Sequence, residues 1–215
     1  MKTEIIHAAS PEAQQHAAKV LRAGGLVAFP TDTVYGLAAL PWDTQAVERL
    51  YEAKERPSER AIPLLLSDAE HLPRVAAIPP LCRDSVSRLI GRYWPGALTL
   101  VLLKTEAVPE VVSRGATVAV RVPALALARS LIRAAGGVLA VTSANISGQP
   151  SPVTAEEVES QLDGRIELII NGGPCPGGVP STIVDCTSAP PTVLRRGAIS
   201  PAELETVLGA VNTTQ

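Results

Sequence analysis

Short apolar runs alternate with amphipathic stretches along most of the chain, and this alternation restricts the possible folds more than any other feature. The runs Leu26–Phe29, Ile62–Leu66 and Val138–Val141 are too short for helices and are bordered or interrupted by glycine or proline. This pattern is typical of buried strands. Between them lie longer segments with helical spacing. We therefore predict one α/β domain over residues 1–215, with a twisted, mixed open sheet flanked by helices.

Local end signals divide the chain further. Helices are predicted from Pro11 to Ala23, from Asp43 to Lys54, over Pro80–Tyr93 and 124–135, and after the capping boxes Thr154-x-x-Glu157 and Ser200-x-x-Glu203. Further strands are predicted at Leu98–Leu103, Thr117–Val122, Ile166–Ile170, Thr182–Val184 and Thr192–Leu194. The tail 212–215 is expected to fray.

Composition limits the class of protein. Aromatic residues make up only 3% of the chain, so its core must be aliphatic. A net charge of −2 argues against a surface that grips nucleic acid everywhere, although a local basic cleft remains compatible with it. No apolar run approaches the ~18 residues of a membrane span, and the N-terminus lacks the apolar centre of a signal peptide. We therefore expect a cytoplasmic protein without membrane contact.

Metal-ligand and redox patterns are missing from the sequence. The cysteines are three in number, without CxxC spacing, which favours a reducing compartment. The three histidines form no HExxH or HxxxH pattern, so we expect no metal site built by the protein. No GxSxG, GxxxxGK[ST] or strand-borne GxGxxG occurs, which argues against a serine hydrolase, a P-loop and a Rossmann site.

Polar side chains gather where predicted strands end. Hydroxyl and amide groups follow the strand Val138–Val141, at Thr142, Ser143, Asn145 and Ser151. Such groups at the carboxyl end of a strand suit a phosphate-bearing ligand, but the same residues are ordinary turn formers. Thr33, in the loop after Phe29, allows the same two interpretations.

Cations mark three further places. Lys54, Arg56 and Arg60 end a predicted helix, where they either offset its dipole or, turned by Pro57, point together into a cleft. Arg121 lies among valines in a strand and needs a carboxylate, either internal or from a ligand. Ser181 and Arg195 lie at the edges of two later strands.

The ordered blocks PTDTVYGL, KERP with IPLLL, WPGALTLVL, VAVRVP, TSANISGQPSP, PSTIVD and LRRGAIS resemble the YrdC-like threonylcarbamoyl-AMP synthase family, in its short single-domain form. The resemblance covers about residues 24–200, and its KxR and SxN signatures match Lys54-x-Arg56 and Ser143-x-Asn145. It implies a YrdC-like twisted open sheet with a basic concave cavity. It also implies a nucleotidyltransferase that joins L-threonine, bicarbonate or CO2 and ATP into threonylcarbamoyl-AMP and releases pyrophosphate.

The resemblance also implies a cellular role. Partner proteins would use the product to make N6-threonylcarbamoyladenosine at position 37 of tRNA, and this chain itself could contact tRNA. Mg²⁺ would accompany ATP, without a metal site built by the protein.

Site residues follow from the same resemblance. The implied catalytic set is Lys54, Arg56, Ser143 and Asn145. The implied L-threonine site consists of Thr33, Arg121, Val141, Thr142 and Ser181. The implied ATP site consists of Arg56, Arg60, Thr117, Ser143, Ser151 and Arg195.

The sequence departs from the family pattern at one position, and it leaves two alternative functions open. Some relatives carry a histidine in the threonine pocket, and here Ser67 stands near that place in the sequence. An RNA-binding module of the same fold would interleave aromatic residues with its cations, which this chain does not do. A carbamoyl-adenylate enzyme of hydrogenase maturation would carry cysteine-rich zinc segments, which are also missing from this sequence.

Overall fold

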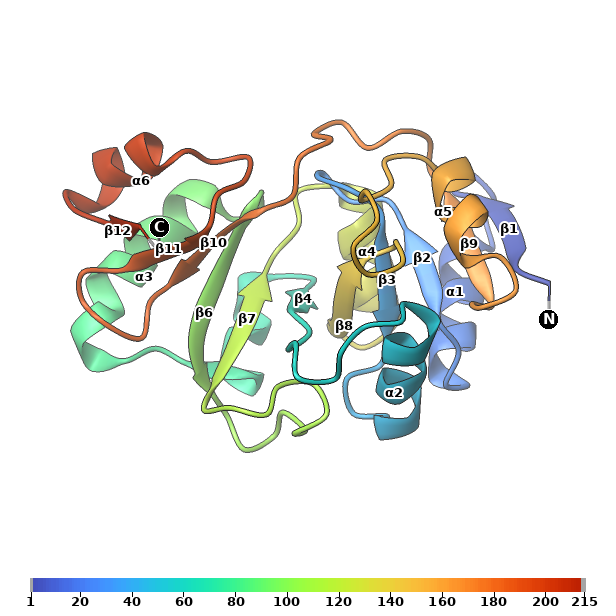
Figure 1. The fold of residues 1–215 in the computed structure, drawn as a ribbon, viewed down its shortest axis with the longest axis horizontal. Helices are drawn as coiled ribbons and strands as arrows, with labels where there is room; N and C mark the ends of the chain where they lie inside the picture. The colour runs from blue at the N-terminus through green and yellow to red at the C-terminus, as the bar shows by residue number, and fades with distance from the viewer. Residues whose placement is uncertain (1, 214–215) are drawn as a thin grey trace.

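The computed structural model describes residues 2–213, which form a twelve-stranded mixed sheet with helices on both faces (Figure 1). The strands are β1 (Glu4–His7), β2 (Val27–Phe29), β3 (Gly36–Ala39), β4 (Leu64–Leu66), β5 (Ala76–Ala77), β6 (Leu98–Lys104), β7 (Thr117–Arg121), β8 (Val138–Ser143), β9 (Leu168–Asn171), β10 (Thr182–Asp185), β11 (Thr192–Arg195) and β12 (Asn212–Thr213). The α-helices are α1 (Ala13–Arg22), α2 (Thr44–Ala53), α3 (Arg83–Tyr93), α4 (Ala126–Ala134), α5 (Ala155–Leu162) and α6 (Pro201–Leu208). Two 3₁₀ helices, η1 (Ala69–Arg74) and η2 (Pro80–Cys82), complete the fold.

The sheet is open and mixed, which confirms the predicted fold class. Its order is β1-β9-β2-β3-β8-β4-β7-β6-β10-β11-β12, and β5 pairs with β6. The strands β3, β8 and β4 pair antiparallel, whereas β4 with β7 and β6 with β10 pair parallel. Because β10 lies beside β6, the long segment after β9 crosses from one half of the sheet to the other (Figure 1).

Helices cover the two faces unequally. Helices α1 and α4 pack together against β2, β9, β4 and β8, and their aliphatic side chains form one core cluster with Phe29 and Leu139. Helices α2, α3, α5 and α6 contribute to the larger cluster on the other face. Alternation along β6 sends Leu98, Leu100 and Leu102 into that larger core, so Thr99 and Val101 face the opposite way. The site described below lies on this opposite face, which is also the face that α1 and α4 pack against.

Local signals account for the helix starts. The Asp43 carboxylate accepts a hydrogen bond from the Ala46 amide (3.1 Å) at the start of α2. Both predicted capping boxes are present, at Thr154 before α5 and at Ser200 before α6. Helix α1 begins two residues later than predicted, at Ala13.

Four strands escape the sequence analysis: β1, β3, β12 and the two-residue β5. Residues Gly36–Ala39 look like the end of a polar loop but form β3, because pairing with β2 and β8 buries all four of them. A Cβ at Gly36 would lie 2.6 Å from Val141 Cγ1, so only glycine permits this approach. Strand β1 pairs with β9, and residues 212–213 pair with β11 instead of fraying. Residues 214–215, the rest of the predicted frayed tail, lie outside the described residues.

None of the helices within residues 2–213 combines the length and the hydropathy needed to span a membrane.

Candidate functional site

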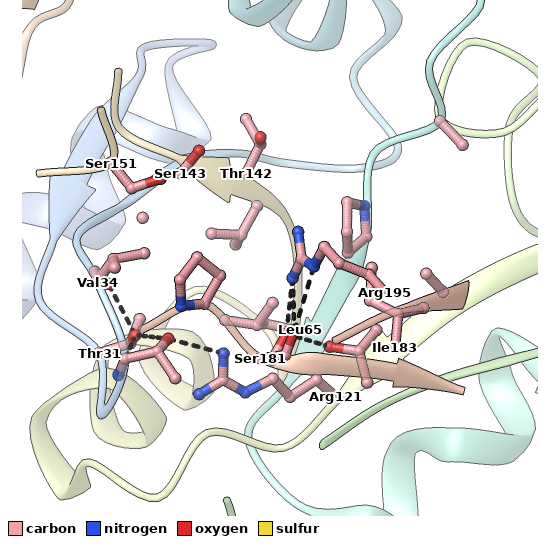
Figure 2. A pocket seen from close by; sticks show the side chains of 18 of the residues that line it. Thr31, Val34, Leu65, Arg121, Thr142, Ser143, Ser151, Ser181, Ile183 and Arg195 are labelled. Carbon is pink, nitrogen blue, oxygen red and sulfur yellow. Dashed lines mark hydrogen bonds between the residues drawn. The ribbon is translucent and has the colours of Figure 1, made fainter. Parts of the chain in front are cut away.

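A cavity of about 380 Å³ opens on the same sheet face as α1 and α4, since its lining residues Leu65 and Val141 also belong to the cluster of these helices (Figure 2). Its volume falls within the roughly 300–1,000 Å³ typical of small-molecule sites. Seven strands contribute to its walls, together with the loops after β2 and after α2. The lining residues are Thr31, Thr33, Val34, Tyr35, Gly36, Arg56, Ala61, Pro63, Leu65, Thr99, Val101, Ala119, Arg121, Val141, Thr142, Ser143, Ser151, Pro180, Ser181, Ile183, Leu194 and Arg195.

Arg121 anchors the most deeply buried part of this cavity. The side chain is 5% exposed, and its Nη2 donates to Asp32 Oδ1 (2.7 Å) while its Nη1 donates to Thr33 Oγ1 (2.9 Å). Its Nε donates to the Gly96 carbonyl (2.8 Å). Of the five N–H groups of a guanidinium, these bonds occupy three and leave one on each Nη. The structure therefore contains the internal ion pair and retains donors for a ligand carboxylate.

Thr33 is held by its own loop. The Thr31 hydroxyl lies 2.9 Å from the Thr33 hydroxyl, accepts from the Thr33 amide (3.1 Å) and donates to the Val34 carbonyl (2.7 Å). This arrangement is a hydroxyl-mediated turn of the kind the sequence suggests. The turn and the site are thus the same feature, because it aims Thr33 into the cavity.

Ser181 and Arg195 form a second polar group beside Arg121. The Ser181 hydroxyl lies 2.8 Å from the Thr99 hydroxyl, and Arg195 Nη2 donates to the Ser181 carbonyl (2.8 Å) and hydroxyl (3.2 Å). The segment after Arg195 can approach Pro180 this closely because residue 197 is glycine. A Cβ at this position would lie 2.3 Å from the Pro180 carbonyl oxygen.

The opposite wall carries hydroxyl groups from the end of β8 and the loop beyond it. Figure 2 shows Thr142, Ser143 and Ser151 along one side of the cavity, across from Arg121, Ser181 and Arg195. Arg56 joins this region from the loop after α2, where its Nη2 donates to the Ala61 carbonyl (3.0 Å).

The charges at this cavity favour an anionic ligand. Within residues 2–213, the lining holds three arginines and no aspartate or glutamate. Desolvation lowers the pKa of Arg195, and the charge of Arg121 lowers it further. Desolvation also lowers the pKa of Arg56, as does the neighbouring Arg60. Because an arginine side chain stays protonated in proteins, these shifts report positive charge that is partly buried and lies near other cations, which an anion would stabilise.

Apolar side chains of the strands form the rest of the lining. Leu65, Ala119 and Val141 come from the central strands, and Val101 and Ile183 come from β6 and β10. Such a surface lets a ligand bury apolar atoms beside the polar groups.

Ser67 does not border the cavity, contrary to the position suggested by the sequence. Ser67 is fully buried, its backbone amide donates to the Gly137 carbonyl (3.0 Å), and its backbone carbonyl accepts from Arg129 Nε (2.9 Å). Leu65 is the side chain of β4 that reaches the cavity, because Leu64 and Leu66 alternate with it and face the larger core, whereas Ser67 lies beyond the end of the strand.

Most of the residues expected from the sequence meet at this cavity. They are Thr33, Arg56, Arg121, Val141, Thr142, Ser143, Ser151, Ser181 and Arg195. Four others do not line it: Lys54 and Asn145 are buried behind the wall, Arg60 is exposed, and Thr117 is half-buried at the beginning of β7.

Three polar contributors have no counterpart in the sequence predictions. Thr31 and Thr99 orient the hydroxyls of Thr33 and Ser181, and Asp32 holds Arg121. Thr99 could be found from the alternation Leu98-Thr99-Leu100, which places one hydroxyl opposite the core face.

Among residues 2–213, Asp68, Glu70 and His71 form the one cluster whose ligand atoms lie within reach of a common metal ion. The Asp68 carboxylate is engaged by Arg129 (2.5 Å) and Arg133 (2.6 Å). Because two guanidinium groups already bind this carboxylate, they disfavour a metal ion there, and the two ion pairs explain why Asp68 lies at this place.

Known proteins similar to this chain were found by sequence and by structure. A family model described as "Telomere recombination" (Sua5_yciO_yrdC) matches residues 19–197. A threonylcarbamoyl-AMP synthase of Pyrococcus abyssi (strain GE5 / Orsay) is 45% identical over 196 residues, which is 91% of this chain and 57% of that protein. One of Bacillus subtilis (strain 168) is 42% identical over 212 residues, which is 98% of this chain and 60% of that protein.

A solved structure has the same fold. The crystal structure of P. abyssi Sua5 complexed with L-threonine superposes with a TM-score of 0.92 and 42% identity, over 100% of this chain and 63% of that one. The present chain therefore spans about three-fifths of the length of these relatives.

Proposed function

This chain belongs to the Sua5/YciO/YrdC family, and on that premise we propose that it is a threonylcarbamoyl-AMP synthase. The proposed reaction joins L-threonine, bicarbonate or CO2 and ATP into threonylcarbamoyl-AMP and releases pyrophosphate, which makes the enzyme a nucleotidyltransferase. The observation that carries the proposal is a cavity whose lining holds three arginines, seven Ser or Thr hydroxyls and, within the described residues, no carboxylate. We further propose that tRNA-modification proteins use the product in the cytoplasm.

The proposed threonine site is the end around Arg121. The two free N–H groups of its guanidinium can donate to the oxygens of a threonine carboxylate. Thr33 and Ser181 orient the amino acid through their hydroxyls, and Thr142 and Val141 complete the wall. The P. abyssi relative has been crystallised with L-threonine, which supports an amino-acid site in this fold.

The proposed nucleotide site extends along the other wall. Arg56 and Arg195 face the phosphates as cations, and Ser143 and Ser151 offer hydroxyl donors. Arg60 and Thr117 stay part of this proposal, although they do not line the cavity in the ligand-free protein.

The proposed chemistry begins on the threonine amine. Its nitrogen adds to CO2 and loses a proton, giving a carbamate with a negative charge. A carbamate oxygen then forms a bond to the α-phosphorus of ATP, and the bond from that phosphorus to the pyrophosphate oxygen breaks. Since the carbamate and the triphosphate that react in this second step are both anionic, the protein contributes mainly positioning and positive charge there. Arg56 and Arg195 would lower the barrier by neutralising the phosphates and the departing pyrophosphate.

We expect magnesium to arrive with ATP, held by phosphate oxygens. The lining within residues 2–213 offers no carboxylate for a magnesium cage, and the nearby Asp32 is engaged by Arg121. No step above depends on a magnesium site built by the protein.

A pyrophosphate-release assay tests the proposal. We expect release that requires threonine, bicarbonate and ATP together and that stops when any one of them is omitted. Release that ignores threonine but follows carbamoyl phosphate would assign a carbamoyl-adenylate activity instead. Salt-dependent RNA binding without any threonine-dependent turnover of ATP would point to an RNA-binding module.

A further inference from the structure

Lys54 lies at the end of α2, directly behind the wall that carries Ser143. The residue is 1% exposed, and its Nζ donates to the backbone carbonyls of Ser143 and Asn145. Its own carbonyl accepts from the Ser147 amide (2.8 Å). Both ends of Lys54 therefore hold the same loop, residues 143–147.

Among the described residues, the charge of Lys54 has no anionic partner. Within residues 2–213, no carboxylate oxygen lies within 4.0 Å of its Nζ, and Arg56 is the charged group that acts on it. Burial, together with the charge of Arg56, lowers the pKa of Lys54 to about 7. A lysine that served as a phosphate ligand would need to reach the cavity, and its Nζ would have to release two carbonyls to do so.

The backbone after α2 separates the two cations of the Lys54-x-Arg56 pair. Glu55 adopts a left-handed conformation (φ 51°), and the Arg56 amide donates back to the Tyr51 carbonyl (3.0 Å). This helix end directs Lys54 inward and Arg56 to the cavity. The left-handed conformation of a non-glycine residue costs about 1–2 kcal/mol, which indicates that the surrounding contacts enforce it.

The loop itself leaves polar atoms unsatisfied. Asn145 Oδ1 and Ser147 Oγ are buried and lack hydrogen-bond partners among the described residues. The Asn145 amide nitrogen donates to the carbonyls of Ile146 and Gln149, both 2.8 Å away within the same loop. The polar side chains of Asn145 and Ser147 thus make no hydrogen bond beyond residues 143–149 among the described residues. Ala144 is buried in the larger core and Ile146 packs against it, whereas the carbonyls of Ser143 and Asn145 are fixed by Lys54.

We propose that Lys54 is a positioning residue that fixes the backbone of residues 143–147 and thereby places the Ser143 hydroxyl in the cavity, without contacting phosphate itself. This inference rests on the proposed function for its kinetic test, and it replaces the sequence expectation that Lys54 neutralises phosphate directly. Lys54 acts on the reaction through Ser143.

A double-mutant cycle separates the two roles. The variants Lys54→Met, Ser143→Ala and the double variant are compared by kcat and by KM for ATP. If Lys54 acts through Ser143, the double variant loses no more than about twofold beyond the weaker single variant. Losses that multiply would show independent contacts and overturn the proposal, as would near-normal pyrophosphate release by Lys54→Met.

Lys54→Gln tests which property of the side chain matters. Glutamine keeps N–H donors and lacks the charge, so a positioning role predicts more activity in Lys54→Gln than in Lys54→Met. Equal loss in both would favour a role for the charge and overturn the proposal. This comparison also serves if Lys54→Met folds poorly.

Backbone hydrogen exchange gives a readout that does not depend on activity. We expect faster exchange in residues 143–149 of Lys54→Met or Lys54→Gln than in the parent protein. The matched control is Lys104→Met, since Lys104 Nζ also donates to a backbone carbonyl, that of Ser113 (2.7 Å), away from the cavity. Unchanged exchange in the loop would overturn the proposal. If the parent protein lacked synthase activity, the proposed function would fail while this measurement still tested Lys54.

Discussion

Replacing Arg121 with methionine gives the most informative single substitution, because the residue serves stability and binding at once. Methionine keeps the length of the side chain and removes all of its hydrogen bonds. Among the described residues, the Asp32 carboxylate then retains the Ala124 amide (2.9 Å) as its one hydrogen-bond donor. Removing one partner of a buried ion pair costs about 3–5 kcal/mol, or a fall in Tm of roughly 6–20 °C for a chain of this size.

The effect on binding is separable from the effect on stability. Arg121 offers its two remaining N–H groups to the proposed threonine carboxylate. Losing a charge-assisted hydrogen bond of about 1.5–3 kcal/mol predicts a roughly 10- to 150-fold rise in KM for threonine. Since this contact is made equally in the ground state and the transition state, we expect kcat and KM for ATP to change little.

The assay combines urea unfolding with pyrophosphate release at saturating ATP. Adding Asp32→Asn to Arg121→Met removes the unpaired carboxylate, so the double variant should recover part of the lost stability while KM for threonine stays high. A rise in KM for ATP with normal threonine kinetics would refute the reasoning and assign Arg121 to the nucleotide. Full stability of Arg121→Met would refute the structural half of it.

Three further predictions follow from other parts of the structure. Gly197→Ala places a Cβ 2.3 Å from the backbone oxygen of Pro180, next to Ser181, so KM for threonine should rise and Tm should fall. The control Gly91→Ala, in α3 with open space around it, should stabilise the protein by roughly 0.5–1 kcal/mol. Normal threonine kinetics in Gly197→Ala would contradict the close approach. Hydrogen bonds from two arginines of α4 lower the pKa of Asp68 from 3.8 to about 2, so this carboxylate stabilises the fold above pH 4 and its contribution is lost as pH falls through 2. The stability difference between the parent protein and Asp68→Asn should therefore shrink in urea titrations towards pH 2, and a difference independent of pH would count against this. Burial raises the pKa of Cys186 from 9.0 to about 12, so the thiol of the folded protein should resist iodoacetamide at pH 9 until denaturant is added. The contribution of Cys186 to stability should fall as pH rises above 9, where only the thiol of the unfolded chain ionises. Rapid alkylation of the folded protein would contradict this prediction, because it would show that the thiol is accessible.

Much of the fold follows from local sequence signals because those signals are physically local. The capping residues Asp43, Thr154 and Ser200 fix helix starts through hydrogen bonds that span three residues. Strand β3 escaped notice because glycine and alanine have little preference for strands, and its burial depends on β2 and β8, which lie elsewhere in the chain. Tertiary pairing overrides local preference there.

The site residues likewise divide into those that the sequence could place and one whose direction depends on the backbone. The resemblance placed Thr33, Arg121, Ser181 and Arg195 in one site, and the structure brings them to one cavity. It did not show that Lys54 turns inward, because that direction depends on the single left-handed residue after it. No periodic pattern in the sequence encodes one backbone angle.

Arg121 shows why some alternatives cannot be resolved from sequence. A lone arginine in an apolar strand needs a carboxylate, and both an internal partner and a ligand satisfy that requirement. The structure contains the Asp32 pair and also places Arg121 on the cavity lining. Both interpretations hold together because a guanidinium has more donors than one carboxylate uses.

The most direct test of the account is a crystal structure with L-threonine and a non-hydrolysable ATP analogue bound together. We predict the threonine carboxylate at the free N–H groups of Arg121, its hydroxyl and amine near Thr33 and Ser181, and the phosphates between Arg56, Arg195 and the Ser143 hydroxyl. Threonine bound outside this cavity, or phosphates on a different face of the sheet, would contradict the claim that one electropositive cavity brings the two substrates together.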